Sequence, residues 1–365
     1  MPNFAPTEEQ EEIRNLARSV AIDQLRPHGR SAEKRGEISL ELMHTLMQTG
    51  LTTPYPESLG GSGTIEAIPY TLIAEELGFG DGALAMNILG SLMGPVAVLL
   101  AGDKTQQAHF ITPFSDEREG YMRFGSFAFA ERTGGYSLPD ISATARLDGE
   151  NYIVNGTKRD VIHGGRSRPR AVLLRLEGTT GLDGLCLLTI PMQPPGMHIR
   201  SDAQKLGLIA ATSVSFTFSN VTVPAVDILG KPGDSGVIRA ATLYNILRGA
   251  VACGMARAAL EYARDYAKER IAFGRPIASY QGIAFMVAEM AMKLDAARLL
   301  VWRAAASWDR GPASETLVNE AEAAQRQAIQ IAKSATTDAV QILGGAGFIQ
   351  DHPVEMWMRN AAAME

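Results

Sequence analysis

Three regions of the chain differ in how hydrophobic and polar residues alternate. From about residue 7 to residue 121, apolar positions recur at the period of a helix with one buried face. The stretch Thr7-Glu8-Glu9-Gln10 has the form of a capping box, so a first helix is expected to begin near Thr7. The pattern predicts a helical N-terminal region. Its clearest apolar positions are Ile13, Leu16, Ala17, Val20 and Ala21, then Leu40, Leu42, Met43, Leu46 and Met47, and the runs Tyr70–Leu77 and Ala83–Leu100.

The pattern changes at about Arg123, where short alternating and β-branched runs replace the helical spacing. The dipeptides Asp148-Gly149 and Asn155-Gly156 favour tight hairpin turns between short strands. A small all-β domain is therefore predicted, closed by a glycine-containing loop near residues 227–233. Its further strand-like runs are Ala171–Leu176, Leu185–Ile190, Val214–Phe218 and Val221–Val223.

Helical spacing returns from about Ile238 to the end of the sequence. Alanine-rich runs at 238–268, 281–309 and 314–344 carry apolar stripes wide enough to pack as a bundle. We expect Glu320–Gln327 to form a solvated face. The core of the bundle is expected to include Met286, Met290 and Met292.

The fold class predicted from these patterns is α+β. Its expected domains are an N-terminal helical domain at 1–122, a middle β-barrel or β-sandwich domain at 123–233 and a C-terminal helical bundle at 234–365.

Composition and charge exclude several classes of function. The 365 residues are 46% hydrophobic and 20% charged with a net charge of −6, so the basic surface of a nucleic-acid binder is missing. Cys186 and Cys253 are far apart, which favours buried thiols in the cytoplasm over a disulfide framework. The N-terminus resembles no leader, and no window is expected to reach the ~20 apolar residues of a membrane span. The histidines show no metal-ligand spacing, so no metal site is predicted.

The stretch Glu269–Pro276 is the strongest candidate for binding chemistry. Gly274-Arg275-Pro276 ends one helix, and a second begins near Gln281, so Arg270 and Phe273 are expected at a corner. A guanidinium matches a phosphate, and an aromatic beside it offers a face to a planar ring. The alternatives are a solvated arginine at a helix end and an aromatic core residue.

The same stretch belongs to a longer ordered pattern that resembles the C-terminal domain of the acyl-CoA dehydrogenase flavoproteins. The order of helical region, β region and four-helix bundle also resembles that family over nearly the whole chain. The resemblance implies FAD bound across a subunit interface in a homodimer or homotetramer, with a heteromer left open. The matching segments are Arg270–Gly274, Gln281–Met292, Gln341–Phe348, Pro353-Val354-Glu355 and Met358-Arg359. The contacts it implies to the FAD pyrophosphate and adenine are Arg270, Phe273, Gln281, Gln341 and Gly345.

Around the flavin ring this sequence departs from the family pattern. The ring contacts implied by the resemblance are Phe129, Ala130, Asp160 and Ile162. Two flavin-facing threonines of the family become Ala130 and Ile162, and a tryptophan becomes Asp160. A carboxylate beside the ring disfavours the anionic reduced flavin, so a poorer hydride acceptor is expected. Asp160 and His163 are candidate acid and base residues for altered chemistry, and the alternative is that both lie on a solvated loop.

The family's catalytic carboxylate has no counterpart in this sequence. In the family, that carboxylate removes the α-proton of an acyl thioester. Counting from Arg359, its position would fall about three residues beyond Glu365. A second base position used by some relatives is occupied here by Tyr244 and Asn245, neither of which is anionic at neutral pH. The candidate substrate contacts are Tyr136, Tyr244 and Arg248.

Three hypotheses follow for the function. The first is an FAD-dependent oxidoreductase of acyl-CoA dehydrogenase type acting on a small acyl thioester of CoA or of a carrier protein. The second is a flavin-dependent oxygenase on the same fold. The third is a non-catalytic subunit that completes the FAD site of a partner chain.

Overall fold

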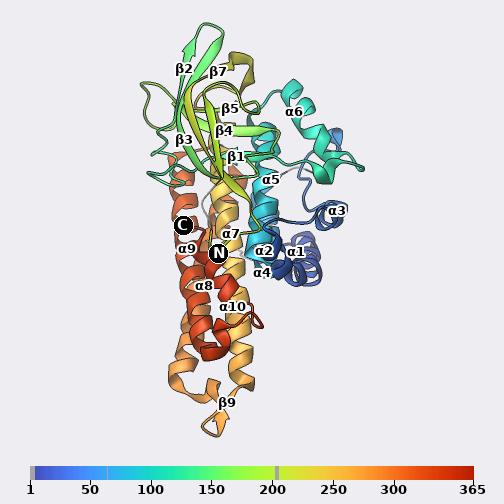
Figure 1. Cartoon of the computed structure of the whole chain (residues 1–365), viewed down its shortest axis with the longest axis vertical. Helices are drawn as coiled ribbons and strands as arrows, with labels where there is room; N and C mark the ends of the chain where they lie inside the picture. The colour runs from blue at the N-terminus through green and yellow to red at the C-terminus, as the bar shows by residue number, and fades with distance from the viewer. Residues whose placement is uncertain (1–4, 64, 202–204) are drawn as a thin grey trace.

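The chain folds into an N-terminal group of helices, a middle sheet and a C-terminal bundle, and the sheet lies at one end of the long axis (Figure 1). This computed structural model describes residues 5–63, 65–201 and 205–365. The predicted α+β fold class is confirmed. Residues 1–4, on which the expectation about a leader partly rests, lie outside the described residues.

The N-terminal helices begin where the capping pattern predicted. The Thr7 hydroxyl accepts a hydrogen bond from the Gln10 amide at 3.3 Å, and the Gln10 side chain accepts one from the Thr7 amide at 3.0 Å. These two bonds satisfy N–H groups that would otherwise be unpaired at a helix start. The helices are α1 (Glu8–Val20), α2 (Arg26–Arg35), α3 (Leu40–Gln48), α4 (Ala67–Gly80), α5 (Gly82–Ala101) and α6 (Lys104–Ile111), with a π-helical turn at Ala21–Leu25 between α1 and α2.

Helix α5 corrects one expectation from the sequence. Among the described residues it is long and apolar enough to cross a membrane by length and composition, with a mean hydropathy of 1.9. However, 89% of that window is buried inside the protein. Its apolar character is therefore explained by its position as a core helix.

The middle region forms one eight-stranded sheet with the order β6-β7-β3-β2-β4-β5-β8, and β1 pairs with β4. The predicted turn at Asp148-Gly149 is confirmed, because Gly149 adopts a φ of 60° between β2 and β3. The turn predicted at Asn155-Gly156 is wrong, because both residues lie within β3 at a β-bulge. The strands are β1 (Ser126–Ala128), β2 (Thr144–Asp148), β3 (Asn151–Ile162), β4 (Arg170–Leu176), β5 (Leu185–Thr189), β6 (Met197–Ser201), β7 (Ser213–Pro224) and β8 (Ile228–Leu229).

The C-terminal bundle is built on three long helices that match the predicted runs. They are α7 (Ser235–Glu269), α8 (Gln281–Arg310) and α9 (Glu315–Leu343), followed by the short α10 (Val354–Ala362). A two-stranded hairpin of β9 (Ile271–Ala272) and β10 (Arg275–Pro276) joins α7 to α8. Alanines line the faces between these helices, which allows their backbones to approach closely.

Two expectations about the bundle surface are wrong. Met292 was expected in the core but is 65% exposed, whereas Met290 is buried. The segment Glu320–Gln327 was expected to be solvated, but Glu322 and Gln325 within it are buried. Met292 belongs to an exposed apolar stripe on α8, in which members are spaced seven residues apart and therefore share one face. The α8 stripe is defined here as Phe285, Met292 and Leu299.

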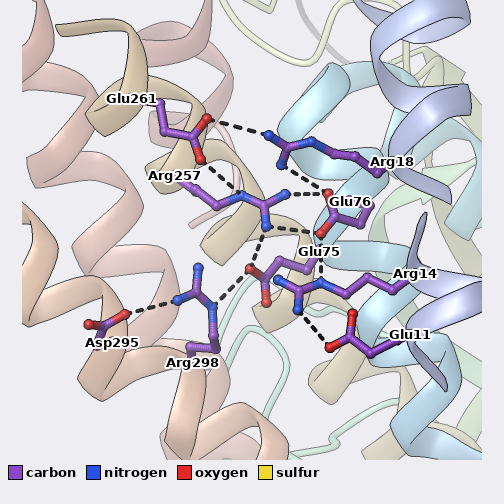
Figure 2. A network of polar contacts seen from close by, with 9 residues as sticks. All are labelled: Glu11, Arg14, Arg18, Glu75, Glu76, Arg257, Glu261, Asp295 and Arg298. Carbon is purple, nitrogen blue, oxygen red and sulfur yellow. Dashed lines mark hydrogen bonds and ion pairs between the residues drawn. The ribbon is translucent and has the colours of Figure 1, made fainter. Parts of the chain in front are cut away.

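A buried network of charges fixes α1 against α4, α7 and α8 (Figure 2). At its centre Glu76 accepts hydrogen bonds from Arg14 at 3.0 Å, from Arg18 at 3.2 Å and from both terminal nitrogens of Arg257. Each buried carboxylate thus faces several cations, which is the condition under which charges are tolerated away from water. The network consists of Glu11, Arg14, Arg18, Glu75, Glu76, Arg257, Glu261, Asp295 and Arg298.

Candidate functional site

A buried ion pair holds together the two segments that the sequence analysis placed beside the flavin ring. Lys158 donates to the Glu131 carboxylate at 2.7 Å and to the Phe129 carbonyl at 3.1 Å. The other Glu131 oxygen accepts from the amide and hydroxyl of Ser142. Burial would raise the pKa of Glu131, but the charge and hydrogen bond of Lys158 outweigh it and lower that pKa. Burial lowers the pKa of Lys158 to about 8, which is still above 7, so the pair is charged at neutral pH and fixes the start of the loop that carries Tyr136.

The three candidate substrate contacts lie together between this loop and α7. The guanidinium carbon of Arg248 lies 3.3 Å from the centre of the Tyr136 ring and 5.9 Å from the centre of the Tyr244 ring. The two tyrosine rings are 6.0 Å apart, and Phe129 packs edge-on against Tyr136 at 5.5 Å. The structure thus brings Tyr136, Tyr244 and Arg248 into one cluster, which we call the Arg248 cluster.

Arg248 is only 2% exposed, yet most of its hydrogen-bonding capacity is unused. Its Nη2 donates to the Met364 carbonyl at 2.6 Å. Its Nε and Nη1 have no hydrogen-bond partner, and both atoms are shielded from solvent. One turn earlier, Asn245 donates to the Tyr136 carbonyl at 3.0 Å and leaves its own Oδ1 unpaired. Buried polar groups in native proteins are nearly always paired, so these atoms require an explanation.

Two cavities adjoin the Arg248 cluster and share Tyr136 and Glu365 as walls. The smaller cavity, of about 40 Å³, is lined by Arg248, Asp160 and Ile162. The larger cavity, of about 240 Å³, is lined by the loop residues Gly134–Ser137 and by α9. The smaller one has room for a few water molecules or a group of similar size.

The two candidate acid and base residues are placed differently. Asp160 lies at a second bulge of β3 with a φ of 54°, lines the smaller cavity and pairs with Arg159 at 2.8 Å. His163 is 2% exposed and its Nε2 faces the Asn87 carbonyl at 3.1 Å. Burial lowers the pKa of His163 to about 3, and Arg166 acts in the same direction. Its ring is therefore neutral at pH 7, and this position favours a structural role.

The residues implied for the FAD ring and those implied for its pyrophosphate and adenine lie far apart in one chain. Phe129, Ala130 and Ile162 are buried beside the sheet. The β9–β10 hairpin, which separates Arg270 from Gln281, lies at the opposite end of the long axis (Figure 1). Because α8 and α9 are antiparallel neighbours, the end of α9 lies beside the start of α8, and this places Gln341 and Gly345 at that same end.

All five residues implied for the pyrophosphate and adenine are exposed at this end. Phe273 is 97% exposed and is held at a φ of 52°, a backbone conformation that is unfavourable for a bulky residue. The Tyr280 hydroxyl steadies the turn by donating to the Ala272 carbonyl at 3.0 Å. A turn with an unfavourable backbone conformation that presents an aromatic ring to solvent is a feature expected of a binding surface.

Comparison with known proteins identifies the family. Models of the acyl-CoA dehydrogenase N-terminal, middle and C-terminal domains match residues 7–118, 126–221 and 234–365. An acyl-CoA dehydrogenase of Bacillus subtilis is 33% identical over 360 residues, covering 97% of this chain and 93% of that protein. A probable acyl-CoA dehydrogenase of Mycobacterium tuberculosis is 30% identical over 361 residues, covering 98% and 91%.

A solved structure agrees with these sequence comparisons. Butyryl-CoA dehydrogenase from Megasphaera elsdenii superposes with a TM-score of 0.84 at 28% identity, covering 100% of this chain and 95% of that one. The chain belongs to the acyl-CoA dehydrogenase family, whose members are FAD-dependent oxidoreductases acting on acyl-CoA thioesters. The resemblance found in the sequence is confirmed.

Two residues that line the larger cavity, Glu322 and Gln325, were not predicted from the sequence. Glu322 accepts a hydrogen bond from the Leu138 amide at 2.8 Å, which fixes the end of the Tyr136 loop against α9. Gln325 lines the same cavity one turn further along the helix. Burial raises the pKa of Glu322 above its ordinary value. Both residues lie in a Glu- and Gln-rich segment, and only the helical phase relative to the apolar positions could have indicated which of them turn inward.

Proposed function

We propose that the chain binds FAD in a site completed by a second copy and acts as an oxidoreductase on a small acyl thioester. The observation that carries this proposal is the separation of the two half-sites. Residues implied for the ring lie beside the sheet, and those implied for the pyrophosphate lie at the far end of the bundle (Figure 1). A single cofactor can reach both sets only if they come from different copies of the chain.

The pyrophosphate half of the site fits the group it would hold. Arg270 and Phe273 are exposed at the β9–β10 hairpin, and in the described part of the chain no ion pair within 4.0 Å involves Arg270. A free guanidinium can bind a phosphate with two parallel hydrogen bonds, and the adenine can stack on an aromatic face. The exposed α8 stripe runs from this end of the bundle and supplies the apolar surface that an interface between copies requires.

The ring half of the site does not fit as the side chains stand. The cavity beside Asp160 and Ile162 is about 40 Å³, which is too small for a group of three fused rings. Tyr136 and Arg248 would have to move to admit it. When bound, FAD would supply the hydride acceptor, and the chain's own residues would position the thioester.

The narrow ring pocket favours a second candidate function. A subunit that pairs with a complete family member could lend its Arg270 end to the partner's FAD and keep its own ring pocket closed. The colour of the purified protein separates the two functions. A yellow protein bleached by an acyl-CoA without oxygen supports dehydrogenation, and bleaching only by NAD(P)H with oxygen uptake supports the oxygenase. A colourless protein that gains flavin only when produced with a second family member supports the partner role.

Substitution at the hairpin tests the shared site directly. Arg270→Ala should weaken FAD binding by about tenfold to a hundredfold, because a charge-assisted hydrogen bond is lost. Arg275→Ala is the matched control, since Arg275 carries the same charge on the same hairpin but stacks on Tyr280 at 4.1 Å. Flavin content per chain and calorimetric titration with FAD are the measurements. Equal FAD affinity in both variants would contradict the proposed site.

The proposed interface is tested on the α8 stripe. Met292→Glu places a charge on the exposed apolar face without disturbing the core, since the side chain is 65% exposed. We expect a shift to smaller species in analytical ultracentrifugation, together with a loss of bound FAD. Glu289→Lys, on an exposed polar position of the same helix, is the control.

A cytoplasmic location belongs to the same proposal and is supported by the two buried free thiols of Cys186 and Cys253.

A further inference from the structure

A cavity of about 460 Å³ lies between α6 and the sheet, apart from both halves of the proposed FAD site. Its walls come from α6, the start of β4, the segment that follows β5 and the turn before β8, and we call it the α6 cavity. It shares no lining residue with the two cavities beside Tyr136. Helix α6 and the sheet also lie at the end of the long axis opposite the β9–β10 hairpin (Figure 1). A cavity of this volume is typical of a site for a small organic molecule.

Hydrogen bonds within the chain fix the walls of the α6 cavity. The Gln106 side chain of α6 donates to the Ile228 carbonyl at 2.8 Å, which ties the helix to the start of β8. The buried Arg170 of β4 donates to the Pro191 carbonyl at 2.8 Å and to the Met192 sulfur at 3.3 Å. Each wall segment is thus tied to another, as in a binding site that is largely formed in advance.

One part of the lining is apolar and reaches the surface. Met192 is 53% exposed and Val226 is 78% exposed, although both are hydrophobic residues. An apolar group that covers such side chains removes them from water, which favours binding. The apolar lining residues are Phe110, Pro169, Ile190, Pro191, Met192 and Val226. The occupant is therefore expected to carry an apolar body.

The charged groups of the same lining do not balance. Two arginines, Arg168 and Arg170, and one aspartate, Asp227, leave a net charge of +1. His109 adds no charge in this arrangement. Its Nε2 lies 3.1 Å from Nη2 of Arg168, and because an arginine can only donate, this Nε2 must be the unprotonated nitrogen. The lining as a whole therefore favours an occupant with a single negative charge.

Arg168 is the group that can receive this charge. Its side chain is exposed at the cavity, and among the residues that the structure describes no carboxylate oxygen lies within 4.0 Å of its guanidinium. Its position is fixed, because its backbone amide donates to the Phe124 carbonyl at 2.7 Å. Arg170, in contrast, is 2% exposed and directs its N–H groups at partners within the chain, among them the Gly164 carbonyl.

We propose that the α6 cavity binds a small monocarboxylate with an apolar body, and that Arg168 holds the carboxylate. A guanidinium matches a carboxylate through parallel hydrogen bonds, and one negative charge matches the net charge of the lining. A phosphate with two negative charges fits less well, since Asp227 lines the same cavity. A neutral ligand of the same shape would leave the charge of Arg168 unmatched. The site involves neither the FAD nor the thioester of the proposed function and does not depend on them.

The test compares 4-phenylbutyrate with its uncharged amide, 4-phenylbutanamide. The cavity holds the volume of roughly fifteen water molecules, so a probe of about twelve non-hydrogen atoms has a suitable size. Binding of each probe to the full chain is measured by isothermal titration calorimetry. We expect the carboxylate to bind about tenfold more tightly than the amide, because hydrogen bonds between charged groups are the stronger ones.

Two matched arginine variants locate the bound carboxylate. Arg168→Gln should weaken the binding of 4-phenylbutyrate by about tenfold or more. Arg123→Gln is the control, because Arg123 is also exposed but lies outside this cavity and pairs with Glu119 at 2.9 Å. It should leave the binding unchanged. The flavin content should be the same in both variants, which separates this site from the proposed FAD site.

Each outcome decides the proposal. A loss of binding in Arg168→Gln that is absent in Arg123→Gln supports it. No binding of 4-phenylbutyrate at about 1 mM, equal binding of the amide, tighter binding of phenyl phosphate or equal losses in the two variants would overturn it and leave a hydrated arginine only. Binding that survives Arg168→Gln would also overturn it.

A second variant keeps the test decisive if Arg168→Gln fails to fold. Val226→Glu adds a negative charge at the rim of the cavity on a side chain that is 78% exposed, and it should weaken the binding of 4-phenylbutyrate by repulsion. Unchanged binding in this variant would then overturn the proposal. A protein that contains no flavin is tested in the same way, so a failure of the proposed function does not affect the result.

Discussion

Two buried arginines on the same helix, Arg257 and Arg248, have opposite surroundings. Arg257 is 7% exposed and faces Glu75 at 3.5 Å, Glu261 at 3.9 Å and Glu76 through both terminal nitrogens (Figure 2). Arg248 is 2% exposed and has one carbonyl partner and two vacant nitrogens. Helix α7 thus carries one guanidinium that faces three carboxylates, although its Nε has no hydrogen-bond partner, and one that no carboxylate of the described residues approaches within 4.0 Å.

The difference separates a structural charge from a candidate binding charge. In the Glu76 network the charges of the buried arginine and glutamates balance one another within the chain, although the Nε of Arg257 makes no hydrogen bond. In the Arg248 cluster two tyrosine rings lie beside one cation, and no carboxylate of the described residues lies within 4.0 Å of it. Buried charges that remain unpaired are costly, and they persist mainly where a ligand or a reaction uses them.

The largest effect on stability is expected for Arg257→Met, which removes the arginine that is paired with buried glutamates. Removing this guanidinium leaves Glu75 and Glu76 buried with fewer cations, and a loss of about 3–5 kcal/mol in the free energy of unfolding is expected. Urea denaturation at pH 7 is the measurement. Arg303→Met, whose side chain is 63% exposed and paired with Glu320, should change stability by less than about 0.5 kcal/mol.

The stability deficit of Arg257→Met is also expected to depend on pH. Burial would raise the pKa of Glu76, but hydrogen bonds from Arg257, Arg14 and Arg18 outweigh it, and the pKa falls below its ordinary value of 4.5. A carboxylate with a lowered folded pKa stabilises the protein above its unfolded pKa, and this contribution is lost as the pH falls through the folded value. The deficit of Arg257→Met should therefore shrink below about pH 4.5. A deficit that does not change between pH 7 and acid would contradict this account.

A smaller effect, of opposite sign, is expected for Asp81→Asn. Asp81 caps α5 by accepting from the Leu84 amide at 2.9 Å, and burial raises its pKa to about 6. Because the folded pKa lies above the unfolded one, stability should fall as the pH rises from about 4 to about 6 and stay low above that. Asparagine keeps the cap and removes the charge, so a gain of up to about 3 kcal/mol is expected at pH 8 and none at pH 4. Unfolding curves at the two pH values measure it, and Asp81→Ala, which loses the cap, should be destabilised at pH 4.

The smallest change in stability is expected for Arg248→Met, which removes the arginine that has no carboxylate partner among the described residues. Loss of stacking on Tyr136 and of the bond to the Met364 carbonyl is offset by removal of an unpaired buried charge. The free energy of unfolding should stay level or rise by about 1–2 kcal/mol. A loss as large as that of Arg257→Met in the same urea experiment would show that Arg248 is already paired.

The sequence predicted correctly those elements whose position is set by neighbouring residues. The capping box at Thr7 and the three long runs of the bundle depend on neighbouring residues and were correct. The turn expected at Asn155-Gly156 failed because Gly156 is needed for a different reason. A Cβ atom there would lie 2.6 Å from the Cα atom of Ala143, so the glycine permits close packing at a bulge.

The features that define the candidate site depend on contacts between distant segments. The sequence placed Tyr136, Tyr244 and Arg248 as candidate substrate contacts through the family resemblance, and the structure brings them together. Nothing in the local sequence indicates that no described carboxylate pairs with Arg248, because that depends on where Asp160 and Glu365 find their own cations. Met292 was misplaced for a related reason, since an apolar residue on a helix can face either its own core or another chain.

The separation of the two half-sites has a consequence for mixtures of damaged chains. Under the proposed shared site, a chain altered at Arg270 can still offer its ring pocket, and a chain altered beside the sheet can still offer its hairpin. When the two altered chains form one dimer, one cofactor site contains both altered halves. The other cofactor site contains the intact ring pocket of one chain and the intact hairpin of the other. Two inactive proteins, refolded together, should thus recover flavin that neither retains alone.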